Sequence, residues 1–205
     1  MQQTMQQRLG QRQAGFTFVE MVIVVVIVGI LAAVALPRFI NLTDEAERAS
    51  SEGVGGGFAS AVGIARAQWE VDNRPDDGEI LMSGTEVTVN QFGYPSGGDD
   101  ADAMTTAACL DAFNTILQSP PAAVEQGFDA RQARYYVTVR GGGGSAVTPD
   151  GGTVTGLSRC VYTLVSTLTL NDNTGIPAPA NPNPDTDGKG FIYNAGTGQV
   201  VSFNN

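Results

Sequence analysis

The 205-residue sequence contains no histidine, and this absence excludes several kinds of chemistry. Histidine-based triads, histidine general bases and histidine metal ligands are all ruled out. The sequence holds only two cysteines, Cys109 and Cys160, which lie too far apart for a C-x-x-C zinc or redox motif. Neither a G-x-S-x-G nor a G-x-x-x-x-G-K-[ST] motif occurs. We therefore expect no enzymatic activity, no catalytic residue and no cofactor.

Basic residues are scarce as well. There are 11 Lys and Arg against 21 Asp and Glu, which gives a net charge of −10. An acidic chain repels phosphate, so nucleic acid is a poor default partner. Charged residues make up only 16% of the chain and hydrophobic residues 42%, whereas disordered chains combine low hydrophobicity with high charge. We therefore expect a folded protein, with many turns supplied by 26 glycines and 10 prolines.

One long segment, residues 21–36, has no charged or polar side chain. It follows a polar segment, residues 1–15, that carries Arg8 and Arg12 and no acid. As a helix, the 21 residues from 16 to 36 would span about 31 Å, which is enough to cross the hydrocarbon core of a bilayer. The basic residues that precede it would remain on the cytoplasmic side.

Three kinds of N-terminal segment fit this pattern. A secretory signal peptide would be cleaved after Ala35, because residues 33–35 form an A-x-A-like site. A simple membrane anchor would be left intact, and a prepilin would be cleaved before the apolar run and would keep it. Glu20 favours the prepilin, because a carboxylate costs up to about 3 kcal/mol at mid-bilayer and the other two segments have no use for it.

Residues 15–20, Gly-Phe-Thr-Phe-Val-Glu, resemble the type IV prepilin motif, in which glycine is followed by Phe-Thr-Leu-Ile-Glu. Phe18 and Val19 replace the usual leucine and isoleucine, and both remain apolar. The resemblance implies that a prepilin peptidase cleaves after Gly15 and then N-methylates Phe16. Glycine at the cleavage point suits close access of the protease to the backbone, because it has no side chain.

The resemblance also implies an assembly role for Glu20. A carboxylate surrounded by hydrocarbon needs a cationic partner, and cleavage creates the free amino group of Phe16. Pairing between that amino group and Glu20 of a neighbouring subunit would set the axial register of a filament. The alternative is an interfacial Glu20 that reaches the lipid headgroups. Gly29 and Pro37 mark the stretch that this family unwinds in the filament, and a mild kink is the alternative there.

The expected fold is α+β, the type IV pilin fold, in which the C-terminal half of a long helix packs on an antiparallel sheet. The amphipathic half is predicted from apolar residues at helical spacing, namely Val54, Phe58, Ala61, Val62, Ala65 and Trp69. Glycines at 53 and 55–57 make a break the alternative to a continuous helix. The expected divisions are a leader (1–15), a hydrophobic transmembrane and polymerisation helix (16–37), an amphipathic helix (38–73) and a β-rich head (74–205).

Within the head we expect one short helix and several strands. The helix is predicted at 104–118 and the strands at 87–92, 135–140, 160–170, 191–194 and 200–203, the last two as a terminal hairpin. Residues 74–102 are expected to form a solvated acidic surface. Residues 171–190, rich in Pro, Asn and Asp, are expected to form a surface loop.

An exported head would meet an oxidising compartment. Cys109 and Cys160 are then expected to form one disulfide, with two separate thiols as the alternative. Asp185 and Asp187 are spaced like calcium ligands but lack the downstream glutamate of an EF-hand, so an Asp-rich turn is preferred to a metal site.

The resemblance implies a structural subunit of a type IV pilus-like cell-surface filament, and the length and head resemble those of the mannose-sensitive haemagglutinin type of pilin. Its partners would be copies of itself, the prepilin peptidase and the inner-membrane pilus assembly machinery. It would cross the inner membrane once before assembly and would then lie in the extracellular pilus. The pilus would serve attachment and motility. The host or surface receptor for attachment is not identified by the sequence. The alternatives are a minor pilin, a pseudopilin of type II secretion, or a secreted binding protein released after Ala35.

Overall fold

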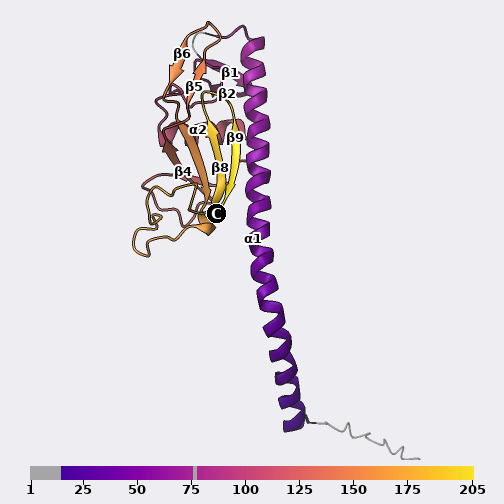
Figure 1. Cartoon of the computed structure of the whole chain (residues 1–205). Helices are drawn as coiled ribbons and strands as arrows, with labels where there is room; N and C mark the ends of the chain where they lie inside the picture. Colours follow the sequence, from indigo (N-terminus) through magenta and orange to yellow (C-terminus); the bar gives the residue numbers. More distant parts are fainter. Residues whose placement is uncertain (1–14, 76–77) are drawn as a thin grey trace, which may run out of the picture. The chain divides into compact units, whose positions relative to one another are not determined.

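The computed structural model describes residues 15–75 and 78–205, so the leader lies outside the described residues except for Gly15. The chain divides into two compact units, Met1–Asp44 and Glu45–Asn205. Helix α1, Phe18–Val71, contributes its apolar part to the first unit and its amphipathic part to the second. The strands found in the described residues all lie in the second unit (Figure 1).

Helix α1 continues without a break through its glycine-rich segment, so the alternative of a break at 53–57 is wrong. Gly55 is buried and lies against Phe191 of the sheet. Gly53, Gly56 and Gly57 are exposed on the other side of the helix. The helix continues because its inward face stays packed through this segment: Ser51 before it and Phe58 after it are buried, and Val54 within it packs against the main core.

Five strands form the main sheet, in the order β3-β4-β7-β8-β9. They are β3 (Ala123–Glu125), β4 (Tyr135–Arg140), β7 (Arg159–Leu164), β8 (Lys189–Asn194) and β9 (Val200–Asn204). Every neighbouring pair is antiparallel except β3 and β4, which are parallel. Two small hairpins accompany this sheet, β1 (Glu79–Met82) with β2 (Thr85–Thr88), and β5 (Ser145–Val147) with β6 (Thr153–Thr155). Helix α2 spans Thr106–Ile116.

The main core lies between one face of this sheet and the two helices. Phe58 of α1 is fully buried at its centre. Its ring lies 5.2–6.0 Å, centroid to centroid, from four others, those of Phe113, Tyr162, Phe191 and Tyr193. Aromatic pairs of this kind contribute about 0.5–1.5 kcal/mol each beyond their buried area. The aromatic residues therefore fix the amphipathic part of α1 and helix α2 on the same face.

The loop from 171 to 188 covers part of the opposite face of the sheet. Tyr136 alternates with Tyr135 along β4 and so points to this second face. Its hydroxyl accepts a hydrogen bond from the Gly127 N–H (2.9 Å) and donates to the Ala180 carbonyl (3.1 Å). Arg140 donates to the carbonyls of Asn181 (3.0 Å) and Pro182 (2.9 Å). Residues 171–188 are free of helix and strand, as expected, but residues 189 and 190 of the predicted loop belong to β8. The loop is bonded to the sheet through Tyr136 and Arg140 and is therefore part of the structure of the head.

The structure confirms the α+β class and the terminal hairpin. It also confirms helix α2 and strands β4, β8 and β9. The strand predicted at 160–170 is too long, because β7 ends at Leu164 and the 3-10 turn Val165–Thr167 follows. The strand predicted at 87–92 is displaced to β2. Strands β1, β3, β5 and β6 were not predicted. Residues 74–102 are not only a solvated surface, because Ile80, Val87 and Phe92 belong to the main core.

Candidate assembly site

The start of helix α1 is stabilised by a reciprocal pair of side chains. The Glu20 carboxylate accepts two hydrogen bonds from Thr17 through the same oxygen, Oε2, one from the backbone N–H and one from the hydroxyl, both of 2.8 Å. In return, the Thr17 hydroxyl oxygen accepts a hydrogen bond of 3.2 Å from the Glu20 N–H. Thr17 precedes the first helical residue and Glu20 is the third, which is the arrangement of a capping box.

This arrangement leaves part of the carboxylate available. An ionised carboxylate has two oxygens and about four acceptor positions, and Thr17 occupies two positions on Oε2. No described residue donates a hydrogen bond to Oε1 of Glu20. Glu20 and Phe16 are both exposed in the single chain. The site can therefore accept a cationic donor from another molecule without losing the cap.

The surface of α1 that follows Glu20 is apolar on every side. Residues Phe18–Leu36 have a mean hydropathy of 3.0, and none of this span is buried within the chain. Among the described residues, this is the one helical segment long and apolar enough to cross a membrane. A helix that is hydrophobic all round must be covered by lipid or by other helices.

Gly29 and Pro37 both lie inside the continuous helix α1. A methyl group built on Gly29 would have no atom within 4 Å, so this glycine is not required by packing within the single chain. The single chain therefore has no break at these residues. Unwinding of this segment in a filament remains a prediction.

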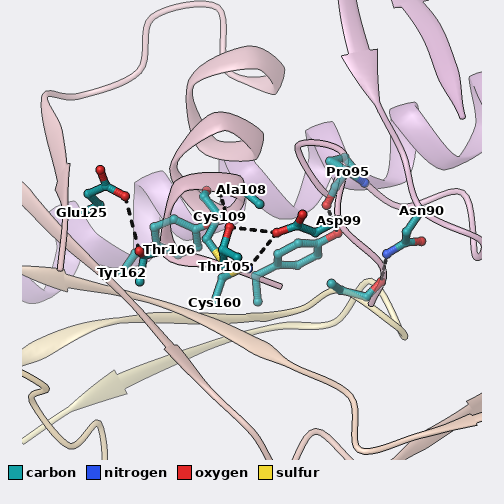
Figure 2. The surroundings of a disulfide bond; sticks show 12 residues. Asn90, Pro95, Asp99, Thr105, Thr106, Ala108, Cys109, Glu125, Cys160 and Tyr162 are labelled. Carbon is teal, nitrogen blue, oxygen red and sulfur yellow. Dashed lines mark hydrogen bonds between the residues drawn. A yellow bond between two sulfur atoms is a disulfide. The ribbon is translucent and has the colours of Figure 1, made fainter. Parts of the chain in front are cut away.

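Cys109 of α2 and Cys160 of β7 form a disulfide, as predicted (Figure 2). Both residues are fully buried. The Tyr162 hydroxyl donates a hydrogen bond to the Cys109 carbonyl (2.8 Å), which ties the same two elements together beside the sulfur atoms. The hydroxyl oxygen of Thr105, which precedes α2, accepts a hydrogen bond from the Ala108 N–H. The N–H and the hydroxyl of Thr105 both donate hydrogen bonds to Oδ2 of Asp99. The disulfide thus anchors the start of α2 to the middle of the sheet.

Asp185 and Asp187 lie in a turn that uses their polar groups locally. Asp187 accepts hydrogen bonds from the Asn183 N–H (2.8 Å) and the Thr186 hydroxyl (3.1 Å), and the Asp185 N–H donates to Asn183 (3.2 Å). Across residues 15–75 and 78–205, no group of three or more Cys, Asp or Glu side chains is placed to hold a metal ion. The Asp187 carboxylate and the Asp185 backbone N–H are thus engaged in the structure of the turn.

Thr17 is the residue bonded to Glu20 at this site, and the prediction from sequence did not single it out. The signal was present, because Thr17 and Glu20 have the S/T-x-x-E spacing of a capping box immediately before an apolar run. The prepilin motif drew attention to Glu20 alone, although the two side chains act together.

Known proteins and families resemble parts of the chain. A family model described as the prokaryotic N-terminal methylation motif matches residues 10–36. The type IV narrow pilus major component PilA5 of Thermus thermophilus is 34% identical over 115 residues, which cover 53% of this chain and 88% of that protein. The fimbrial protein EcpC of Eikenella corrodens is 37% identical over 85 residues, which cover 40% of this chain and 51% of that protein. No solved structure matches the chain.

Proposed function

This chain belongs to the type IV pilin family, and from that premise we propose that its mature form polymerises through α1 into a cell-surface filament. The relatives that it resembles are named as a pilus component and a fimbrial protein, which supports a structural subunit. We propose attachment to surfaces as the role of the filament, with motility as a further role.

The observation that carries this proposal is the uncovered apolar helix. The side chains of Ile23, Leu31 and Leu36 are 52%, 64% and 65% exposed, although each is strongly hydrophobic. Burial of apolar surface contributes about 25 cal/mol per Å², so leaving this span in water is strongly unfavourable. The inner membrane would cover it before assembly, and the helices of neighbouring subunits would cover it in the pilus.

We propose that Glu20 sets the register of assembly. Its free oxygen, Oε1, would accept the methylated amino group of Phe16 from a neighbouring subunit, while Oε2 keeps its bonds to Thr17. A buried charge is costly unless it is paired, so subunits displaced along the axis would be disfavoured. Glu20 then acts as a specificity element, and the surrounding apolar surface supplies most of the assembly energy.

The processing steps follow from the same proposal. The prepilin peptidase would remove residues 1–15 by cleavage after Gly15 and would methylate Phe16. Residues 16–37 would then serve as the transmembrane and polymerisation helix, with unwinding between Gly29 and Pro37 on assembly. The inner-membrane assembly machinery would move the subunit from a single-pass membrane form into the extracellular pilus.

Replacement of Glu20 tests the proposal. We expect Glu20→Val to be cleaved and inserted normally but to give few or no filaments in sheared preparations. Glu45→Val, which removes another exposed carboxylate of α1 outside the apolar span, is the matched control and should assemble. Normal filaments from Glu20→Val would refute the register role. A mature N-terminus at Leu36 instead of Phe16 would refute the retained helix and support a secreted protein.

A further inference from the structure

A groove of about 470 Å³ lies along helix α1 within the second unit. One wall is a face of α1 that includes Gly57, Ser60 and Ile64. The other walls are the end of α2 with the residues that follow it, and the hairpin of β1 and β2 (Figure 1). Among the described residues that line the groove, none carries a charge. The groove is therefore a second surface of α1, separate from the cap formed by Thr17 and Glu20.

The groove presents mainly apolar side chains to an occupant. Ile64 is 60% exposed in the single chain, although it is strongly hydrophobic. Two hydroxyl groups of the lining are used within their own helices, since Ser60 donates to the Gly56 carbonyl (2.9 Å) and Thr115 donates to the Asp111 carbonyl (2.9 Å). A charged occupant would find no opposite charge in this lining and would lose its hydration. The chemistry of the groove favours an apolar occupant.

The α1 wall is shaped for close approach of another backbone. A methyl group built on Gly57 would meet no atom within 4 Å, so the packing of the single chain does not require a glycine there. Glycine is nevertheless a poor residue for an exposed helix interior. From residue 53 to residue 65, α1 also carries no charged side chain. Small uncharged residues on one helix face allow a second helix to pack closely against it.

The chain itself provides an apolar helix that needs a cover. The apolar span of α1, Phe18–Leu36, is uncovered in the single chain, and it is the one segment of this kind among the described residues. It cannot reach the groove of its own chain, because the span and the α1 wall belong to one continuous helix. The span lies at the start of α1 and the groove lies towards its end. Copies staggered along a filament axis would therefore bring the span of one copy level with the groove of another.

We propose that the groove binds the apolar span of α1 from another copy of the chain. This inference rests on the polymerisation through α1 proposed above and adds the surface of the second unit that receives the span. It is the helix-in-groove mode of recognition, in which apolar side chains of a helix enter an apolar groove. One turn of helix with its side chains occupies about 500 Å³. The groove is thus large enough for about one turn of the span, and binding would cover Ile64.

Disulfide cross-linking identifies the occupant. Ser60→Cys places a thiol in the groove, and the native Cys109 and Cys160 are already joined in a buried disulfide. This variant is combined with one further cysteine at each position of 21–36 in turn, and sheared filaments are oxidised. A disulfide needs Cα atoms within about 7 Å of each other. We expect covalent multimers at positions that repeat every three or four residues, because one face of the span enters the groove.

Two controls accompany the cross-linking. Asp172→Cys, at an exposed position outside the groove, replaces Ser60→Cys and should give no multimers with the same partner positions. Ser60→Cys chains kept as monomers in detergent should give none either. The proposal is overturned if filaments form but give no multimers, or if Asp172→Cys gives as many as Ser60→Cys does.

Filling the groove is the second test. Gly57→Leu should fold, because its side chain enters open space, but the yield of sheared filaments should fall at least about tenfold, or about 1.4 kcal/mol per subunit. Gly63→Leu is the matched control, since this exposed glycine also has no atom within 4 Å of an added methyl group and does not line the groove. It should assemble normally. Circular dichroism checks the fold of both variants, and Ser60→Leu takes the place of Gly57→Leu if the latter does not fold.

The outcomes separate this inference from the proposed function. Normal filament yield from Gly57→Leu, or an equal loss from Gly63→Leu, overturns the role of the groove and leaves polymerisation through α1 intact. Absence of filaments from the unchanged chain, with its assembly machinery present, overturns both.

Discussion

Gly55 of α1 lies so close to Phe191 of β8 that a methyl group on its Cα would come within 3.2 Å of the phenylalanine Cβ and Cγ. The same methyl group on Gly56 would meet no atom within 4 Å. These two adjacent glycines of α1 thus differ in how closely they contact the sheet. Gly55 permits the close approach of helix and sheet, while the packing of the single chain does not require Gly56.

We therefore expect opposite effects from alanine at these two positions. Gly55→Ala should destabilise the head by about 1–3 kcal/mol, because the added methyl overpacks the contact with Phe191. Gly56→Ala should stabilise it by up to about 1 kcal/mol, because alanine is the better helix former. Urea unfolding followed by Trp69 fluorescence measures both. Equal effects of the two substitutions would contradict the proposed distinction.

The capping box at Thr17 gives a second prediction. Thr17→Val keeps the shape of the side chain but removes the hydroxyl that bonds to Glu20 in both directions. Loss of a helix cap costs about 1 kcal/mol, which corresponds to about a fivefold change in local opening. Amide hydrogen exchange at Glu20 should therefore be at least about fivefold faster in the detergent-solubilised chain.

Thr43→Val is the matched control for that experiment. Thr43 also carries a bonded hydroxyl, which donates to the Phe39 carbonyl (3.1 Å) within α1, but it caps no helix end. Its substitution should leave exchange at Glu20 unchanged. If Thr17→Val likewise leaves that exchange unchanged, the reciprocal bonds do not stabilise the start of the helix.

The disulfide gives a third prediction. Cys109 and Cys160 close a loop with a sequence separation of 51, for which the chain-entropy model gives about 4 kcal/mol of stabilisation. Replacing both cysteines by alanine should lower the free energy of unfolding of the head by about that amount. Because both residues are fully buried, dithiothreitol should reduce the bond slowly until urea opens the head. Rapid reduction of the folded chain would contradict this.

Local sequence signals predicted the elements that depend mainly on local pattern. Tyr135–Arg140 alternates between the two faces of the sheet and was predicted with correct bounds. The terminal hairpin was predicted from two β-rich segments joined by a short glycine-containing turn. The assembly role of Glu20 stays a prediction, and it too rests on local features, namely the acid and its spacing from the glycine.

The remaining features depend on contacts between distant residues. Strand β3 has three residues and exists through its parallel pairing with β4, which no short pattern reveals. The apolar alternation continues beyond Leu164, but the Val165 N–H donates to the Arg134 carbonyl (3.0 Å) and the chain then forms a 3-10 turn. The groove beside Ser60 combines residues up to 63 positions apart, such as Gly57 and Pro120, and was not predicted for the same reason.

Asp129 and Arg131 form a surface pair whose titration gives a fourth prediction. Arg131 donates to both oxygens of Asp129, with Nε–Oδ1 at 2.9 Å and Nη2–Oδ2 at 2.6 Å, and the Arg131 N–H adds a bond of 3.0 Å. These bonds favour the ionised carboxylate and lower the pKa of Asp129 from 3.8 to about 2. A carboxyl whose pKa is lowered on folding stabilises the folded chain above its unfolded pKa. That contribution is lost as the pH falls through about 2.

Carboxyl chemical shifts measured between pH 5 and pH 1.5 by NMR would test this pair. We expect Asp129 to titrate at about 2, and Arg131→Gln to raise its pKa towards 3.8, because glutamine removes the charged donors. Arg159→Gln is the matched control, since Arg159 donates to the Gly141 carbonyl and has no carboxylate partner among the described residues. It should leave the pKa of Asp129 unchanged. If the Asp129 pKa is near 3.8 in the unchanged chain, the bonds to Arg131 do not persist in solution, and this turn is then held by the hydrogen bond from the Ala130 N–H to the Gly175 carbonyl (3.0 Å).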